Sequence, residues 1–107
     1  LQKTTHRSFH KIEPGAHVFA MTSHTHRLGI RATIHRGVSK DSPGELLHES
    51  TDWADPPFDQ FDPPLTFEPG EGLILTCEYD NTTEEHVGFG LSATDEMCFL
   101  WAHYFVP

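Results

Sequence analysis

The chain is organised around the segment Ser23-His24-Thr25-His26-Arg27-Leu28-Gly29. This segment continues a stretch of low polarity, residues 16–21, which follows the turn signal Pro14-Gly15 and is expected to be a β-strand. Alternate side chains of a strand share a face, so His24 and His26 project to the same side and can place two imidazoles on one metal ion. The same alternation predicts three further residues on that face: Val18, Ala20 and Thr22.

A third donor that suits such a pair of imidazoles lies far downstream, in the segment Asp95-Glu96-Met97-Cys98. The thioether of Met97 is a soft, uncharged donor that suits Cu(I) far better than hard cations, so a site completed by Met97 implies copper, with zinc as the lesser alternative. Histidine pairs are also commonly solvated or hydrogen-bonded, and a buried methionine is most often core filler. Spacing and periodicity alone do not join Met97 to the histidines.

Length and charge restrict the class of protein. The 107 residues suffice for one domain with a single core that needs no metal to fold. Seven basic against sixteen acidic residues give a formal net charge of −9, which argues against nucleic acid or an anionic membrane as a partner. No apolar run approaches the roughly 18 residues of a membrane span, and no signal peptide is recognisable. We therefore expect a soluble, acidic domain that is either processed, trimmed or excised from something larger.

Alternating polarity and turn signals predict an all-β protein. The clearest strands are expected over residues 16–26, 28–36, 72–79, 86–91 and 98–106. Residues 1–13 are interpreted as an entering strand or an ordered arm, and shorter strands are expected near residues 45–50 and 58–61. The sequence contains no amphipathic helix, and its turn signals recur at roughly 8–12 residue intervals, which is typical of an antiparallel β-sandwich.

The two cysteines, Cys77 and Cys98, both fall in segments predicted as buried strands. Two cysteines are too few to indicate a disulfide framework. Composition alone therefore leaves open whether they are free buried thiols, which behave as small hydrophobes, or a disulfide.

Four motifs, in their order and separation, resemble one protein family. They are His17-Val18-Phe19-Ala20-Met21-Thr22-Ser23-His24-Thr25-His26-Arg27-Leu28-Gly29, then Gly88-Phe89-Gly90, then Asp95-Glu96-Met97-Cys98, and the ending Trp101-Ala102-His103-Tyr104-Phe105-Val106-Pro107. Over residues 14–107 the chain resembles the C-terminal catalytic domain of the copper type II, ascorbate-dependent monooxygenases. The resemblance implies a jelly-roll-like β-sandwich, a single domain over residues 1–107, in which His24, His26 and Met97 bind one copper ion and form the catalytic centre.

The resemblance also implies features around that centre. Cys77 and Cys98 match cysteines that pair in the family, and such a bond would stabilise the fold by about 3 kcal/mol. It implies an oxidising, extracytoplasmic compartment, periplasmic or secreted. The position of Glu96 beside Met97 leaves two alternatives, independent of the resemblance: an acceptor that orients an imidazole, or an exposed acid in a turn. His17 matches a family histidine near the copper strand.

In the family, the copper held by these ligands binds dioxygen, and hydrogen is abstracted from a substrate C–H bond there. The other electron comes from a second copper on a separate N-terminal domain that ascorbate reduces. The remaining histidines of this chain show no counterpart of the adjacent histidine pair of that domain. The resemblance therefore implies an N-terminal or separate electron-transfer copper domain as a partner, and ascorbate as the external reductant.

The expected substrate cleft differs from that of the peptide-amidating family members. Thr22 stands where those enzymes have an arginine that binds the peptide carboxylate. Phe99 and Trp101 stand where an asparagine and a tyrosine help to hold the peptide. Losing the bidentate anion contact removes the basis for binding a free carboxylate. We therefore expect a small-molecule substrate other than a peptide with a free carboxylate.

Three functional classes follow. The chain is the oxygen-activating half of a copper monooxygenase, a copper-binding module without turnover that serves delivery, storage or sensing, or a structural β-sandwich with incidental histidines. Stoichiometric Cu(I) binding that Met97→Ala abolishes would separate the first two classes from the third. A second β-sandwich upstream in the parent gene, with adjacent histidines and another His-x-His, would separate the first class from the second.

Overall fold

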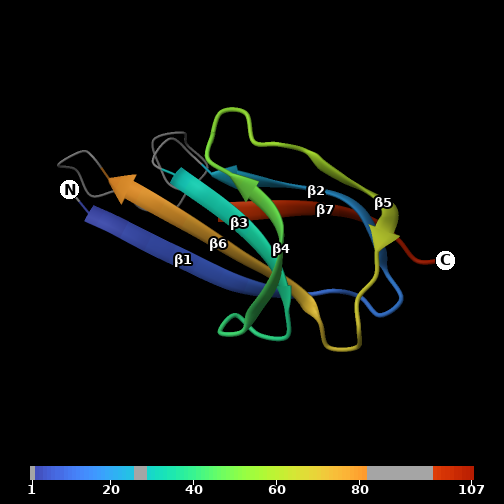
Figure 1. Cartoon of the computed structure of the whole chain (residues 1–107). Helices are drawn as coiled ribbons and strands as arrows, with labels where there is room; N and C mark the ends of the chain where they lie inside the picture. The colour runs from blue at the N-terminus through green and yellow to red at the C-terminus, as the bar shows by residue number, and fades with distance from the viewer. Residues whose placement is uncertain (1, 26–28, 82–97) are drawn as a thin grey trace.

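The chain folds into antiparallel strands that form two sheets (Figure 1). The computed structural model describes residues 2–25, 29–81 and 98–107. The strands are β1 (Gln2–Lys11), β2 (His17–Thr25), β3 (Gly29–Gly37), β4 (Pro43–Ser50), β5 (Asp59–Leu65), β6 (Gly72–Asn81) and β7 (Cys98–Phe105). One sheet has the order β1-β6-β3-β4 and the other the order β5-β2-β7.

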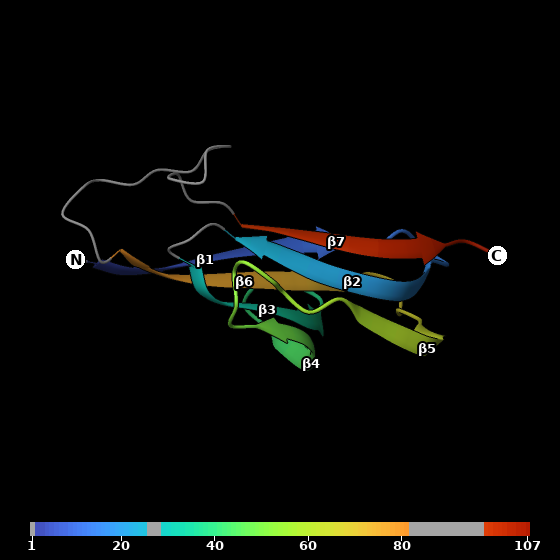
Figure 2. The same ribbon diagram turned by 90° about the horizontal axis from the view of Figure 1, so that it is seen from above.

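The two sheets pack face to face around an apolar core. Figure 2 shows β2 and β7 in one layer and β6, β3 and β4 in the other. Inner-face side chains of β2, β3 and β6 form the buried cluster: Val18, Met21, Ala32, Ile34, Leu73, Leu75, Cys77 and Tyr79. The predicted antiparallel β-sandwich is confirmed, and its chain repeatedly crosses from one sheet to the other, as in jelly-roll sandwiches.

Alternation in the sequence locates most strands correctly. The arm predicted over residues 1–13 is β1, which pairs with β6 along its whole length. β4 and β5 occupy the two shorter segments expected near residues 45–50 and 58–61. The strand predicted over residues 86–91 lies outside the described residues. Among the residues that the structure describes, no helix has the length and apolar content to span a bilayer.

One detail of β2 differs from the prediction. Regular alternation puts Val18 on the same face as His24, but Val18 is fully buried in the core whereas His24 lies on the opposite face. The cause is a β-bulge: the two residue steps from Val18 to Ala20 oppose a single step on β7, from Tyr104 to His103. An extra residue at Phe19 reverses the alternation of the strand. The prediction that Val18 shares the face of His24 is therefore wrong, because the bulge lies between them.

A disulfide joins the two sheets, as the family resemblance implies. Cys77 of β6 is bonded to Cys98 of β7. Cys77 lies within the buried cluster, and Cys98 packs against it. Because Cys98 opens β7, the bond fixes the first residue of that strand to the facing sheet.

We expect His35 of β3 to make the fold less stable in acid. Burial, together with the positive charges of Arg7 and Arg31, lowers the pKa of His35 below its ordinary value of 6.5, against a smaller opposing effect of Glu49. The unfolded chain then binds a proton more readily than the folded chain, so the free energy of unfolding decreases as the pH falls through 6.5 toward the lowered pKa.

Chemical denaturation at about pH 8 and about pH 5 measures this effect, because a histidine changes charge between those values. The wild type should lose more stability between the two pH values than the His35→Asn variant does. Equal losses in the two proteins would contradict the assignment to His35.

Candidate metal centre

The end of β2 that carries His24 pairs with the beginning of β7. In this register Thr22 lies opposite Trp101, His24 opposite Phe99, and Thr25 opposite Cys98. Directly opposed residues of an antiparallel pair point to the same side of the sheet. Thr22, His24, Phe99 and Trp101 therefore share the outer face, while Ser23, Thr25 and Cys98 face the other sheet.

Two aromatic residues of β7, Phe99 and Trp101, lie beside His24 on this outer face. The centroids of the His24 and Trp101 rings are 5.8 Å apart, in an edge-on arrangement. Phe99 and Trp101 lie with their centroids 6.3 Å apart, and both side chains are half-exposed. The Thr22 hydroxyl donates a hydrogen bond of 2.8 Å to the carbonyl oxygen of Pro57, in the segment that leads into β5. The structure thus brings together Thr22, Phe99 and Trp101, the three residues expected at the substrate cleft, around one of the expected metal ligands.

The other expected ligands, His26 and Met97, lie outside the described residues, as does Glu96. In the sequence, His26 directly follows Thr25 and Met97 directly precedes Cys98. The described part of the chain contains no group of three His, Cys, Asp or Glu side chains that could hold a metal ion. A metal centre built on His24 therefore depends on donors beyond that part.

Comparison with known proteins identifies the family. Residues 3–107 match the copper type II ascorbate-dependent monooxygenase, C-terminal domain. The chain belongs to this family. A curated relative, tyramine beta-hydroxylase of Caenorhabditis briggsae, is 31% identical over 97 residues, which cover 87% of this chain and 16% of the relative. This copper monooxygenase domain thus corresponds to a small part of the length of that relative.

His24 is the expected metal ligand that the structure describes, and its surroundings fit the copper that the family uses. The expected donor set, two imidazoles and a thioether, is soft and uncharged, which suits Cu(I). The ring of His24 faces outward and is half-buried, beside the indole ring of Trp101. A partly apolar surrounding suits copper that is to react with dioxygen better than a fully hydrated surrounding does.

His17 lies at the other end of β2 from His24. Its ring stacks on Phe105, with centroids 5.2 Å apart. Phe19 continues this group, with its centroid 6.2 Å from those of both His103 and Phe105. Sequence reasoning did not anticipate this row of rings, although the alternation of Phe99, Trp101, His103 and Phe105 in the last strand is a visible signal of it.

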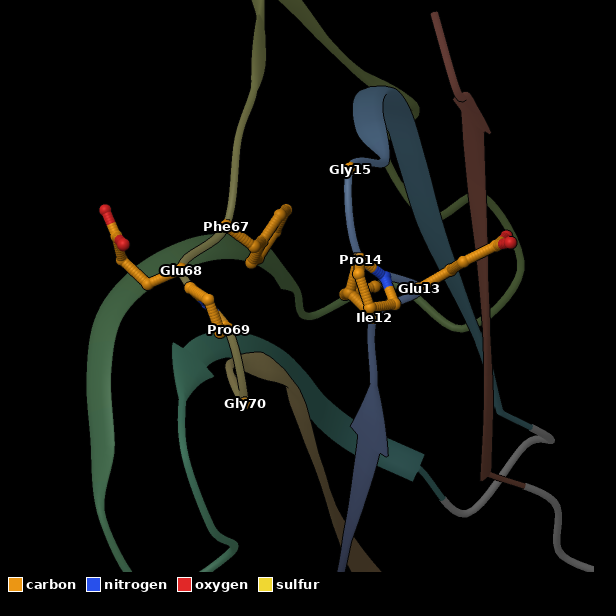
Figure 3. Close-up of a pocket in the computed structure, with 8 residues that line it drawn as sticks. All are labelled: Ile12, Glu13, Pro14, Gly15, Phe67, Glu68, Pro69 and Gly70. Carbon is orange, nitrogen blue, oxygen red and sulfur yellow. The ribbon is translucent and has the colours of Figure 1, made fainter.

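A small cavity lies between the turns at the far end of the sandwich (Figure 3). It is lined by residues 12–15 and 67–70 and has a volume of about 60 Å³. Pockets for small organic ligands usually have volumes of roughly 300–1,000 Å³. Residues 12–15 of its lining come just before the start of β2, whereas His24 lies near the end of that strand. The cavity is therefore not part of the candidate metal centre.

A buried polar network behind His24 was missed by sequence reasoning. Ser23 Oγ lies 2.8 Å from His48 Nε2, and His48 Nδ1 lies 2.6 Å from Asp59 Oδ2. The three residues come from β2, β4 and β5. No sequence spacing links them, because three separate strands bring them together.

Proposed function

We propose that this chain is the oxygen-activating copper domain of a copper- and ascorbate-dependent monooxygenase, with His24, His26 and Met97 as its metal ligands. The observation that carries the proposal is the pairing of Thr25 with Cys98. His26 and Met97 are the next residues of the chain beyond that pair, and consecutive Cα atoms are only about 3.8 Å apart. The outward-facing His24, one residue before Thr25, completes the set.

The copper supplies dioxygen binding and one-electron chemistry when it is bound, and the chain's own residues hold and orient the substrate. Phe99 and Trp101 offer flat, half-exposed rings beside His24, which suit an apolar part of a small substrate. The Thr22 hydroxyl donates its hydrogen bond to the Pro57 carbonyl oxygen. Thr22 thus stabilises the rim of the proposed cleft, and it offers no positive charge for a substrate carboxylate. The substrate itself stays unassigned beyond a small molecule with an accessible C–H bond.

Two further features belong to the proposal. A second copper domain, on the same polypeptide or on another subunit, would supply the second electron after reduction by ascorbate. The disulfide between Cys77 and Cys98 supports an extracytoplasmic location, secreted or periplasmic, because such bonds persist in oxidising compartments.

A Cu(I) titration under anaerobic conditions, with a chromogenic chelator as competitor, tests the proposal. We expect one Cu(I) ion per chain, and a loss of affinity in His24→Ala and Met97→Ala that exceeds the roughly 10–100-fold cost of removing a residue outside the ligand set. X-ray absorption of the copper-loaded wild type should show a sulfur ligand, and Met97→Ala should lack it. Wild-type protein that binds no stoichiometric copper would refute the proposal.

His103→Ala is the matched control. His103 is an exposed histidine on the outer face of β7, and its ring neighbours are Phe19 and Phe58. Its removal should leave the Cu(I) affinity unchanged. Copper binding that persists without any hydroxylated product, even when an electron-transfer copper domain and ascorbate are supplied, would instead indicate a copper-binding module without turnover.

A further inference from the structure

We propose that Ser23, His48 and Asp59 form a positioning device that holds the copper-binding end of β2 against the facing sheet. This inference rests on the proposed function, because it assigns the network a role toward the ligand His24. None of the three residues is itself proposed to touch the metal. They act through the backbone of β2, in which Ser23 is the residue directly before His24.

The network crosses the sandwich. His48 lies on β4, an edge strand of the four-stranded sheet, and reaches Ser23 and Asp59 on β2 and β5 of the other sheet. Its side chain is completely buried, and Ser23 is 2% exposed. A buried imidazole with partners on both nitrogens has its position fixed from two directions, because leaving either nitrogen unpaired would be costly.

The carboxylate decides the direction of the hydrogen bonds. An ionised carboxylate only accepts, so His48 Nδ1 donates to Asp59 Oδ2. In the neutral imidazole Nε2 is then the acceptor, and the Ser23 hydroxyl donates to it. His48 thus has a partner on each ring nitrogen, and Ser23 is held by an imidazole whose orientation Asp59 sets.

The same three residue types form the nucleophilic site of serine hydrolases, but this network lacks access for a substrate. Ser23 Oγ lies between the sheets, and its residue is 2% exposed. An acyl donor would have to enter the core to reach it. The burial therefore favours a structural coupling over a second catalytic site.

His24 lies between two ties that join the sheets. Ser23, on one side of His24, is linked through His48 to β4. Thr25, on the other side, pairs with Cys98, and the disulfide links Cys98 to Cys77 of β6. Both neighbours of His24 point inward and are held, so the His24 ring is directed outward by a backbone that cannot easily rotate. Ligands held in position before the metal arrives bind it more tightly.

Cu(I) affinity and the Cu(II) electron paramagnetic resonance spectrum test the proposal on the full chain. Ser23→Ala and His48→Ala should each weaken Cu(I) binding by about tenfold, the lower end for residues outside the ligand set, and should alter the copper hyperfine splitting. Asp59→Ala should act in the same direction. Asp59→Asn should retain more affinity than Asp59→Ala, because its amide oxygen can still accept from His48 Nδ1.

Leu75→Val is the matched control for a general loss of stability. Leu75 is a buried core residue on β6, and Ile34 of β3 stands between it and His48 in the register of the sheet. Its truncation removes none of the hydrogen bonds of the network, so it should leave Cu(I) affinity within about twofold of the wild type. Asp59 is partly exposed, with 39% of its side chain accessible, so its variants provide a test even where His48→Ala does not fold.

A readout without copper separates this proposal from the metal site itself. In the copper-free chain, Ser23→Ala should speed amide hydrogen exchange at His24 and Thr25 selectively, whereas Leu75→Val should not act selectively there. Copper affinity and spectra in Ser23→Ala and His48→Ala that match the wild type would overturn the positioning role and leave the copper site standing. A wild type that binds no copper would overturn both. Labelling of Ser23 by a fluorophosphonate would overturn the positioning role in favour of an accessible nucleophile.

Discussion

Replacement of Cys77 and Cys98 together by alanine is expected to lower the free energy of unfolding by about 3 kcal/mol. The bonded cysteines are separated by 21 residues in the sequence, so the bond removes a substantial part of the conformational freedom of the unfolded chain. For a domain of this size the loss corresponds to a decrease of roughly 12–24 °C in Tm. Thermal and guanidinium unfolding under non-reducing conditions measure both quantities.

The same replacement should also weaken copper binding. Cys98 lies opposite Thr25, and the bond ties that pair to β6. Reduction of the wild-type chain should reproduce the loss of stability, whereas the doubly substituted chain should not respond to reductant. If the double variant unfolded at the same denaturant concentration as the wild type, the bond would have no stabilising role.

The sequence was sufficient to predict most of the strands that the structure describes, because polar and apolar side chains alternate along them. It was not sufficient to predict the bulge at Phe19. That irregularity arises from the way β2 pairs with both β5 and β7, and the register of each pairing shifts between Val18 and Ala20. Pairing is a property of two or three strands together, whereas alternation is read along one strand.

In the candidate site, too, some residues could be predicted from the sequence and others could not. The resemblance to the family identified His24, Thr22, Phe99 and Trp101, which the structure brings together on one face, and it identified the disulfide. It gave no indication of the network of Ser23, His48 and Asp59. The chain has nine histidines, and nothing in the sequence assigned a role to His48. Its partners come only from the packing of β4 against the other sheet.

Met21→Ala is expected to lower the free energy of unfolding by about 2–5 kcal/mol, and Phe19→Ala by about 1 kcal/mol or less. Met21 is fully buried at 0% exposure, and its truncation leaves a cavity between the sheets. Phe19 is 42% exposed on the outer face, where its ring lies near the rings of His103 and Phe105. Guanidinium unfolding of the two variants gives the comparison directly.

This pair of variants tests the β-bulge at Phe19, which places Val18 on the core face although His24 faces outward. In a regular strand Phe19 and Met21 would share a face, and the two truncations would have similar costs. Beyond the bulge the strand is regular: Met21, Ser23 and Thr25 face the core, so His24 faces solvent and the aromatic rings of β7. Equal losses of stability in the two variants would mean that Phe19 shares the buried face of Met21 and that β2 alternates regularly, so that Val18 would lie on the outer face with His24.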